Sequence, residues 1–462
     1  MSTMYDLIVI GSGPGGEKGA AQAAYFGKRV AVIEKEDAPG GAAVHTGTLP
    51  SKTLRETALY LSGHRSRELY DISVNLTDRY AAVPHLIRRT QAIAESEVKR
   101  IRENVNRHNI DYYKGVGTIA SPHEVMVHQD QSTLTLHGAH ILIATGSSPF
   151  HPPGFNFQNP KILDSDQILN INRLPESLLV LGAGVIGCEY ACMFAALGIE
   201  VTLADARDRI LPFLDAEIAD RLTTAMGTLG IRFSLGKSWT TVTESDSISC
   251  TFNDDETLEM DTLLFAAGRV GNTSSLGLEN VGIEVNHRGL VEVNNHYQTQ
   301  QPHIYAVGDV IGFPALASTS MEQGRVAMCH AFDFTYKQSV SNLLPFGIYT
   351  IPEVSSVGET EESAQTKELD YVVGKALFRE NARGQIAGDT EGMTKLVIEK
   401  QSRKVIGCHV VGERASELIH TGQAVMHLGG TVDTFIEMVF NYPTLTESFK
   451  YAAYDALAKL ES

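Results

Sequence analysis

Two stretches of the chain carry the residue types that hold a dinucleotide. Glycine clusters occupy residues 11–16 (GSGPGG) and 182–187 (GAGVIG), and each cluster follows a run of four apolar residues. At the same distance along the chain from the first glycine, an acid closes the next apolar run: Glu34 in one stretch and Asp205 in the other. Glycines let backbone N–H groups approach a pyrophosphate at a helix N-terminus, and the acid accepts hydrogen bonds from a ribose. The chain is therefore predicted to hold two dinucleotides and to pass electrons between them.

Both motifs need a strand before the glycines and a helix after them. Residues 7–10 and 178–181 are the expected first strands, and residues 30–33 and 201–204 are the expected second strands. One isolated glycine cluster is as readily a flexible turn. The repetition of strand, helix and acid in both copies favours two binding sites.

The rest of the sequence predicts supporting elements. An apolar strand at residues 304–307 leads to Asp309, whose carboxylate would lie at the carboxyl edge of a sheet, where α/β proteins bind ligands. Residues 86–105 have the period of a long, charged amphipathic helix. From about Tyr349 onward, alternating strands with two helices and no glycine cluster indicate an interface or substrate domain.

Composition narrows the classes of partner. A length of 462 residues suggests about three domains. A net charge of −17 disfavours binding to nucleic acid or to an anionic membrane. No run of about 20 apolar residues exists, which argues against a membrane span. The N-terminal residues lack the pattern of a secretion signal, so a cytoplasmic protein is expected.

The cysteines are predicted to be structural. There are five, an odd number, and they follow no paired metal-ligand spacing: Cys188, Cys192, Cys250, Cys329 and Cys408. Core packing in a reducing compartment is the expected role, and no metal site is predicted.

With these residues laid out, the chain resembles the two-dinucleotide flavoprotein family of lipoamide dehydrogenase and glutathione reductase over almost its whole length. The matching motifs occur in order at residues 11–16, 40–41 with 50–52, 144–146, 182–187, 267–269 and 305–309. The resemblance implies an α/β fold with two Rossmann-like nucleotide-binding domains, one for FAD and one for NAD(P), plus a C-terminal α+β dimerisation domain. It also implies a homodimer.

The resemblance gives domain boundaries as well. Residues 1–148 would form the first part of the FAD-binding domain, and residues 272–345 its second part. Residues 149–271 would form the NAD(P)-binding domain. Residues 346–462 would form the interface domain.

The redox-active thiols of the family are missing. Two cysteines separated by four residues form the family's redox disulfide, but Ala43 and Thr48 occupy those positions here. The family's histidine base is replaced by Tyr442, and a tyrosine, with an ordinary pKa near 10, is a poor base at neutral pH. The role of Glu447 without that histidine is either structural or across a subunit boundary. His45 is expected to be packed or solvated rather than a proton donor.

Within the family, residues 47–52 and 442–444 are most similar to members that transfer hydride between NADH and NADP(H) through FAD. Two positions, Ala43 and Asp205, depart from the usual residues of that branch. Asp205 favours NAD(H), because its charge opposes a 2′-phosphate, while Arg207 offsets that charge and permits NADP(H).

The resemblance also assigns roles at the hydride site. Lys52 and Glu189 would pair beside flavin N5, where the ammonium favours the anionic reduced flavin. Thr48 would either donate a hydrogen bond near the flavin or fill the space of a lost sulfur. Asp309 would bind the flavin ribitol, and Glu34 would bind the adenosine ribose.

The complete set of predicted cofactor-binding residues joins these motifs. It comprises Gly11, Gly13, Pro14, Gly16, Glu34, Lys35, Gly41, Thr48, Lys52, Gly117, Thr145, Gly146, Gly182, Gly184, Val185, Ile186, Glu189, Asp205, Ala206, Arg207, Gly268, Arg269, Gly308, Asp309, Leu316 and Ala317.

Three functions follow from these residues. The leading one is hydride transfer between NADH and NADP(H) in alternate half-reactions at one nicotinamide site. The second is an NAD(P)H:quinone or dye reductase, because the lost disulfide leaves room for a planar acceptor. The third is a redox sensor or electron-transfer protein, for which the sequence offers no docking tail or charge block.

The missing thiols generate the first prediction. Anaerobic titration with a two-electron reductant should stop at reduced FAD, without the long-wavelength band of a thiolate-to-flavin complex. Lipoamide, glutathione and mercuric ion should not be reduced, because Ala43 and Thr48 provide no dithiol. Uptake of four electrons at the active site would contradict this.

Overall fold

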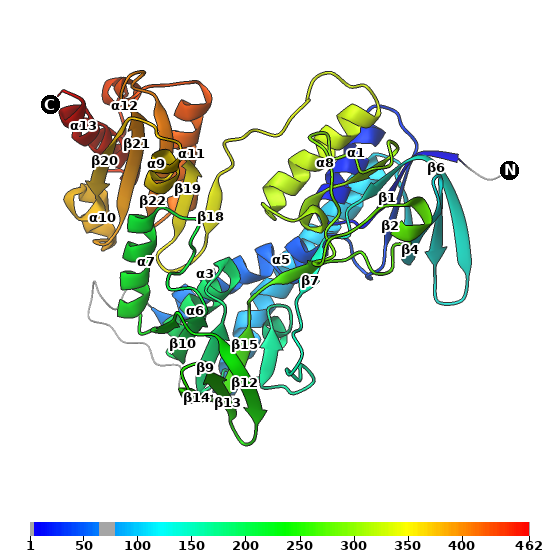
Figure 1. Ribbon diagram of the computed structural model, residues 1–462, viewed down its shortest axis with the longest axis horizontal. Helices are drawn as coiled ribbons and strands as arrows, with labels where there is room; N and C mark the ends of the chain where they lie inside the picture. Colours follow the sequence, from blue (N-terminus) through cyan, green and yellow to red (C-terminus); the bar gives the residue numbers. More distant parts are fainter. Residues whose placement is uncertain (1–3, 64–78, 462) are drawn as a thin grey trace. The chain divides into compact units, whose positions relative to one another are not determined.

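The computed structural model describes residues 4–63 and 79–461 and divides into two compact units (Figure 1). The first unit comprises Met1–Thr53, Ile87–His151 and Gly268–Ser341. The second comprises Leu54–Leu86, Pro152–Ala267 and Asn342–Ser462. The domain boundaries implied by the family resemblance stay a prediction.

A largely parallel sheet forms the first unit. Its strands run in the order β3-β2-β1-β6-β5-β4, with β17 beside β6, and β4, β5 and β6 pair antiparallel. All five residues of β2 are buried, as expected for a parallel strand covered on both faces. The strands expected at residues 7–10 and 30–33 are confirmed. The strands are β1 (Met4–Ile10), β2 (Val30–Glu34), β3 (Asp111–Lys114), β4 (Val116–Ser121), β5 (Glu124–His128), β6 (Thr133–Ile143) and β17 (Ile304–Ala306).

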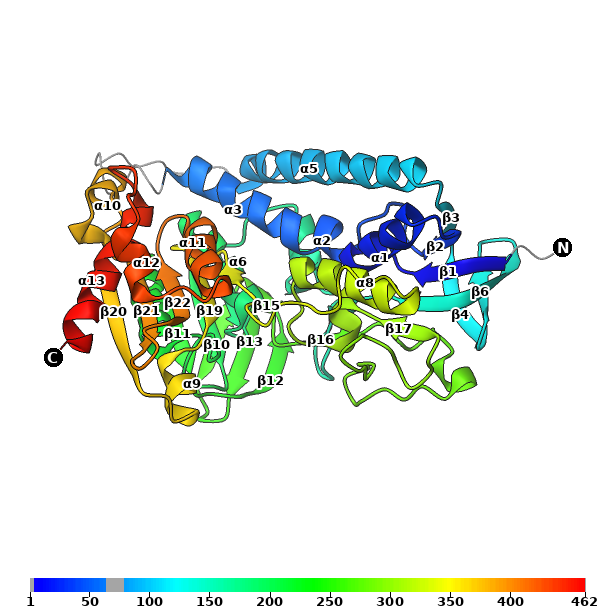
Figure 2. The same cartoon turned by 90° about the horizontal axis from the view of Figure 1, so that it is seen from above.

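Two helices, α1 (Pro14–Tyr25) and α8 (Ala317–Ala331), lie side by side in this unit (Figure 2). Glycines allow their close approach, since a Cβ atom on Gly324 would lie 2.3 Å from the carbonyl oxygen of Gly15. Beneath them the apolar side chains of Leu7, Val9 and Val32 form a core against the sheet.

The long helix expected at residues 86–105 is confirmed as α5 (Arg79–Arg107). Its side chains Arg100 and Asn104 donate hydrogen bonds to the buried carboxylate of Glu17 on α1, at 3.3 and 2.9 Å. This clamp holds α5 on the helix that begins at the first glycine cluster. Short elements complete the unit: α2 (Gly41–His45), the start of α3 (Thr48–Ser62), β7 (Ser147–Pro149), β16 (Arg269–Gly271), η2 (Leu278–Val281) and η3 (Gly308–Ile311).

A second parallel sheet carries the second glycine cluster. Its strand order is β11-β10-β9-β15-β8. The three strands between β11 and β15 in the chain form a separate antiparallel sheet, β12-β13-β14. The strands expected at residues 178–181 and 201–204 are confirmed. The elements are β8 (Ile162–Asp164), η1 (Gln167–Asn170), β9 (Ser177–Leu181), α6 (Val185–Ala196), β10 (Glu200–Asp205), α7 (Ala216–Thr228), β11 (Arg232–Leu235), β12 (Trp239–Glu244), β13 (Ile248–Phe252), β14 (Thr257–Met260) and β15 (Thr262–Phe265).

The C-terminal part forms an antiparallel sheet in the order β18-β19-β22-β21-β20, with α11 and α13 packed on it and α12 packed against α13 (Figure 1). The sequence predicts two helices here, whereas residues 346–461 form five. Three of them have only six residues, too few for a helical period to be recognised. The elements are β18 (Phe346–Ile348), β19 (Val354–Gly358), α9 (Glu361–Thr366), β20 (Tyr371–Leu377), η4 (Phe378–Glu380), α10 (Ala382–Ala387), β21 (Met393–Glu399), β22 (Val405–Val411), α11 (Ala415–His427), α12 (Val432–Glu437), η5 (Leu445–Glu447) and α13 (Ser448–Leu460).

All five cysteines are buried and unbridged, which confirms their predicted structural role. Burial raises the pKa of Cys192 and of Cys250 to about 12, so both thiols stay protonated at neutral pH. Within the part of the chain described, no helix is long and apolar enough to cross a membrane.

Candidate functional site

The two glycine clusters occupy equivalent places, at the carboxyl ends of β1 and β9. Gly11 and Gly182 have φ angles of +99° and +113°, which favour glycine. A Cβ atom on Gly11 would lie 2.4 Å from the carbonyl oxygen of Ala144. On Gly16 and Gly187 it would lie 2.0 and 1.8 Å from the carbonyl oxygen of the first glycine of the same cluster. The first and last glycines are therefore required by the turn itself and by close packing of helix on strand.

The middle glycine of each cluster is not required by the protein's own packing. Among the described residues, no atom beyond the immediate neighbours lies within 4 Å of a Cβ built on Gly184, and for Gly13 the nearest is the Cα of Gly41 at 3.9 Å. This space lies at the N-termini of α1 and α6, where backbone N–H groups are available to an anion. The arrangement fits the pyrophosphate of a dinucleotide in both units.

The acid of each motif is hydrogen-bonded to its own glycine cluster. Glu34 accepts the backbone N–H of Ser12 at 2.9 Å, and Asp205 accepts that of Ala183 at 2.6 Å. Ser12 and Ala183 both follow the first glycine, so the two motifs share this contact. The structure therefore brings each predicted ribose acceptor to its loop.

The two acids differ in their second partner. Glu34 accepts the hydroxyl of Ser12 at 2.6 Å, whereas Asp205 is clamped by Arg207 through Nε at 2.8 Å and Nη2 at 2.6 Å. Burial alone would raise the pKa of Asp205, but hydrogen bonds from Arg207 and from backbone N–H groups lower it below its usual value. The side chain of Arg207 is 48% exposed, so solvent or a ligand can reach it. This acid is held ionised with a cation beside it.

The carboxyl edge of the first sheet gathers further predicted residues. Ser147 donates to Asp309 at 2.9 Å and accepts a hydrogen bond from Arg269 Nε at 2.8 Å. The hydroxyl oxygen of Thr145 is buried without a hydrogen-bond partner among the described residues. An orphaned buried hydroxyl fits a ligand that supplies the partner. Sequence reasoning missed Ser147, although it directly follows the matched motif at residues 144–146.

Residues 43–48, which in the family carry the two redox-active cysteines, contain no cysteine in this chain. Ala43 lies in α2, and Thr48 is exposed at the start of α3. His45 makes a hydrogen bond through Nε2 to the carbonyl oxygen of Pro39 at 3.0 Å, as expected for a packed side chain. Lys52, one turn into α3, donates to the hydroxyl of Ser51 at 3.3 Å.

Glu189 lies on α6 and is only 4% exposed. Its carboxylate accepts the backbone N–H of Tyr349 at 2.9 Å. Sequence reasoning missed Tyr349, because a backbone donor 160 positions away belongs to no local motif. Lys52 is part of the first unit and Glu189 of the second, and their pairing stays a prediction.

The remaining predicted residues occupy loops and element ends. Lys35 follows β2 with a side chain 59% exposed, and Leu316 directly precedes α8. Tyr442 is 73% exposed, and Glu447 ends η5, where it accepts a hydrogen bond from the hydroxyl of Tyr451. Cofactor contacts of Gly117, Ala206, Gly268 and Ala317, like those of the others, stay predictions.

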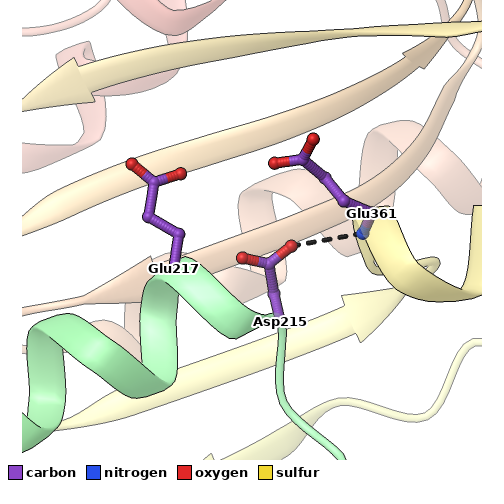
Figure 3. A group of neighbouring side chains, drawn as sticks. All are labelled: Asp215, Glu217 and Glu361. Atoms are coloured by element: carbon purple, nitrogen blue, oxygen red, sulfur yellow. Dashed lines mark hydrogen bonds between the residues drawn. The ribbon is translucent and has the colours of Figure 1, made fainter.

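A cluster of three carboxylates in the second unit has the spacing of a metal site. Asp215 and Glu217 come from the start of α7 and Glu361 from the start of α9 (Figure 3). The ammonium of the buried Lys395 lies among them, 2.7, 3.1 and 2.5 Å from the three carboxylates in that order. An ammonium has three donors, so Lys395 is fully paired and already supplies the cation. The cluster is therefore an internal ion-pair network that joins α7 to the C-terminal sheet, beside a cavity of 640 Å³.

The fold and these loops define a class of protein: a flavoprotein with two dinucleotide sites on separate sheets. The family model described as pyridine nucleotide-disulphide oxidoreductase matches residues 5–324, and the dimerisation domain of the same family matches residues 344–453. The chain belongs to this family. It is an FAD-dependent pyridine nucleotide oxidoreductase, and the dimerisation domain bears out the expected homodimer.

Among full-length relatives, a protein of Mycobacterium tuberculosis named soluble pyridine nucleotide transhydrogenase is 46% identical over 99% of this chain and 98% of the relative. One with the same name from Chromohalobacter salexigens is 39% identical over 99% of each. Among solved structures, LpdA from Mycobacterium tuberculosis gives a TM-score of 0.89 at 29% identity, covering 97% of this chain and 99% of LpdA. A Cu(II) complex of the HOCl-induced flavoprotein disulfide reductase RclA from Escherichia coli gives 0.88 at 27%, covering 98% and 99%.

Replacing Lys395 tests the ion-pair network. Lys395→Met leaves the fully buried Asp215 without its cation and should lower the free energy of unfolding by about 3–5 kcal/mol. As a control, Lys99→Met removes a side chain that is 78% exposed and 4.0 Å from Glu103, and should cost less than about 1 kcal/mol. Denaturant unfolding at pH 7 measures both variants, and equal losses would contradict the network's importance.

The same network predicts a dependence on pH. Burial would raise the pKa values of Asp215 and Glu217, but their lysine partners lower them below the ordinary 3.8 and 4.5. Carboxylates with lowered pKa values stabilise the fold fully above their unfolded pKa values, and this contribution is lost as the pH falls through the folded ones. The stability difference between the natural protein and Lys395→Met should therefore shrink below about pH 4.

Arg207 generates a prediction about nucleotide choice. NADH should bind more tightly than NADPH, because the negative charge of Asp205, the predicted ribose acceptor, opposes a 2′-phosphate. Arg207→Ala should weaken NADPH binding on the order of 10-fold, since a charge-assisted hydrogen bond is lost, and should change NADH binding less than about threefold. Arg232→Ala is the control, because Arg232 pairs with Glu200 at the opposite end of the strands. Equilibrium titration of both nucleotides measures this, and equal weakening would mean that Arg207 does not contact the phosphate.

Proposed function

We propose that the protein transfers hydride between NADH and NADP⁺, with FAD as its resident cofactor. The observation that carries this proposal is the absence of sulfur at both Ala43 and Thr48 within an otherwise complete dinucleotide-binding framework. Thiol–disulfide exchange needs a thiolate, so this site cannot reduce disulfides by the family's route. The full-length relatives named soluble pyridine nucleotide transhydrogenase support the same reaction.

The first unit has the groups to hold FAD. The space at Gly13 accepts the pyrophosphate, and Glu34 accepts hydrogen bonds from the adenosine ribose. The buried hydroxyl of Thr145 and the carboxylate of Asp309 offer polar contacts at the same sheet edge. Bound FAD supplies a ring system that accepts a hydride and returns it.

The second unit binds the nicotinamide nucleotides at residues 182–187. Because the sequence provides one such cluster beyond that for FAD, donor and acceptor take turns at it. Asp205 binds the ribose of NAD(H), and Arg207, held beside it, is placed to meet the 2′-phosphate of NADP(H). One site with both groups fits a protein that must use both nucleotides.

Lys52 and Glu189 form the charged part of the proposed hydride site. A positive charge near the flavin favours the state in which negative charge has developed there, and in a partly dry site it acts strongly. Glu189 is nearly buried, and its carboxylate is held by a hydrogen bond from the backbone N–H of Tyr349. The two residues thereby stabilise charge without donating a proton.

A quinone or dye reductase is the second candidate. The small side chain of Ala43 and the exposed side chain of Thr48 take less space than a disulfide, which favours access of a planar acceptor. We also propose that the protein acts in the cytoplasm, because five unbridged cysteines suit a reducing compartment.

Transient kinetics test the proposal. Anaerobic NADH should bleach the absorbance of the bound flavin, and NADP⁺ added after removal of NAD⁺ should restore it. Steady-state transhydrogenation should give parallel double-reciprocal lines, because one site serves both nucleotides in turn. If NADP⁺ leaves the flavin reduced while a quinone reoxidises it roughly tenfold faster than any nucleotide, the reductase takes the place of the transhydrogenase.

A further inference from the structure

A buried arginine follows Lys52 by three positions on α3. Arg55 is only 4% exposed, yet it carries a full charge. Its Nε donates to the carbonyl oxygen of Thr350 at 3.0 Å, and its Nη1 lies 3.2 Å from the carboxylate of Glu353. It also pairs with Glu56, its neighbour on the helix, at 2.6 Å. Burial of a guanidinium is costly without such partners, so these contacts fix both the arginine and the segment it meets.

The segment that Arg55 contacts also holds Glu189. Tyr349 directly precedes Thr350, and its backbone N–H is the donor to Glu189 Oε1 at 2.9 Å. Arg55 therefore binds Thr350, the residue next to Tyr349, whose N–H holds the carboxylate of Glu189. Both contacts lie within the second unit.

A hydrogen-bond chain closes the arrangement from the other side. The side chain of Tyr349 lies beside Ser416, whose hydroxyl donates to Glu353 Oε2 at 2.6 Å. Glu353 therefore accepts Arg55 on one carboxylate oxygen and Ser416 on the other. Thr350 is fully buried and Glu353 is 9% exposed, so water does not replace these bonds readily.

We propose that Arg55 is a positioning residue for the hydride site. It fixes residues 349–353 so that the N–H of Tyr349 holds the carboxylate of Glu189 in one orientation. This inference rests on the proposed function for the roles of Glu189 and Lys52. The C-terminal part of the chain then contributes to the reaction through its backbone.

A double-mutant cycle separates positioning from a merely structural role. Arg55→Gln should slow the reduction of the flavin by saturating NADH on the order of 10-fold, with little change in NADH affinity or FAD content. Combined with Glu189→Gln, it should slow the reaction no further than Glu189→Gln alone, because it acts through that carboxylate. Effects that multiply in the double variant, or an unchanged reduction rate in Arg55→Gln, would overturn the proposal.

Two further variants control the experiment. Arg173→Gln breaks another arginine–carboxylate pair, with Asp261 at 2.7 Å, and should leave the reduction rate unchanged. Ser416→Ala removes one hydroxyl from the chain of hydrogen bonds and should slow reduction in the same direction by about threefold. It keeps the test available if Arg55→Gln does not fold, and a normal rate in a folded Ser416→Ala would then count against the proposal.

Hydrogen exchange provides a readout that does not depend on turnover. The Tyr349 amide should exchange faster in Arg55→Gln and in Glu189→Ala than in the natural protein, and at the natural rate in Arg173→Gln. Unchanged exchange at Tyr349 in Arg55→Gln would overturn the proposal. If NADH fails to reduce the natural protein, or NADP⁺ fails to reoxidise it, the proposed function fails, and the exchange rate of this amide still decides the role of Arg55.

Discussion

The structure depends on one repeated contact: a backbone N–H just after the first glycine of a cluster donates to the acid that ends the neighbouring strand. Ser12 meets Glu34 in the first unit, and Ala183 meets Asp205 in the second. The contact requires a turn so tight that the first and last glycines cannot carry a side chain. It leaves the middle glycine open to a ligand and places a ribose acceptor beside it, so each unit forms a dinucleotide site by the same geometry.

The two dinucleotide sites share this geometry but differ in the charged groups around their acids. Glu34 accepts hydrogen bonds from the backbone and hydroxyl of Ser12, whereas Asp205 also accepts them from the guanidinium of Arg207. Elsewhere in the second unit, Lys395 pairs with three carboxylates whose spacing alone resembles a metal site. In both cases the acids are paired with a cation, but the two cations differ in burial. Arg207 remains accessible to a ligand, whereas Lys395 is buried and fully paired within the protein.

Without the family's redox-active thiols, the proposed reaction depends on charged side chains and on the backbone hydrogen bonds that hold them. The five cysteines are buried, and burial raises the pKa of the Cys188, Cys192, Cys250 and Cys408 thiols above the ordinary value. The carboxylate of Glu189 accepts a peptide N–H from Tyr349, the residue that directly follows β18 of the C-terminal sheet. A domain matched as a dimerisation module therefore also reaches the residue proposed to act beside the flavin.

The sequence by itself determined the strands, glycine turns, helices and acids of both nucleotide motifs and the absence of thiols, because these signals are local and depend on residue type within one βαβ unit. It underestimated the short helices of the C-terminal part, which lack a recognisable period. Only the tertiary structure decided which distant partners fix the charged side chains. Lys395 meets Asp215 across 180 positions, Glu189 meets the Tyr349 N–H across 160, and Arg55 meets Thr350 across 295. Such contacts follow from how packed elements meet in space, and no periodicity or motif in the chain records them.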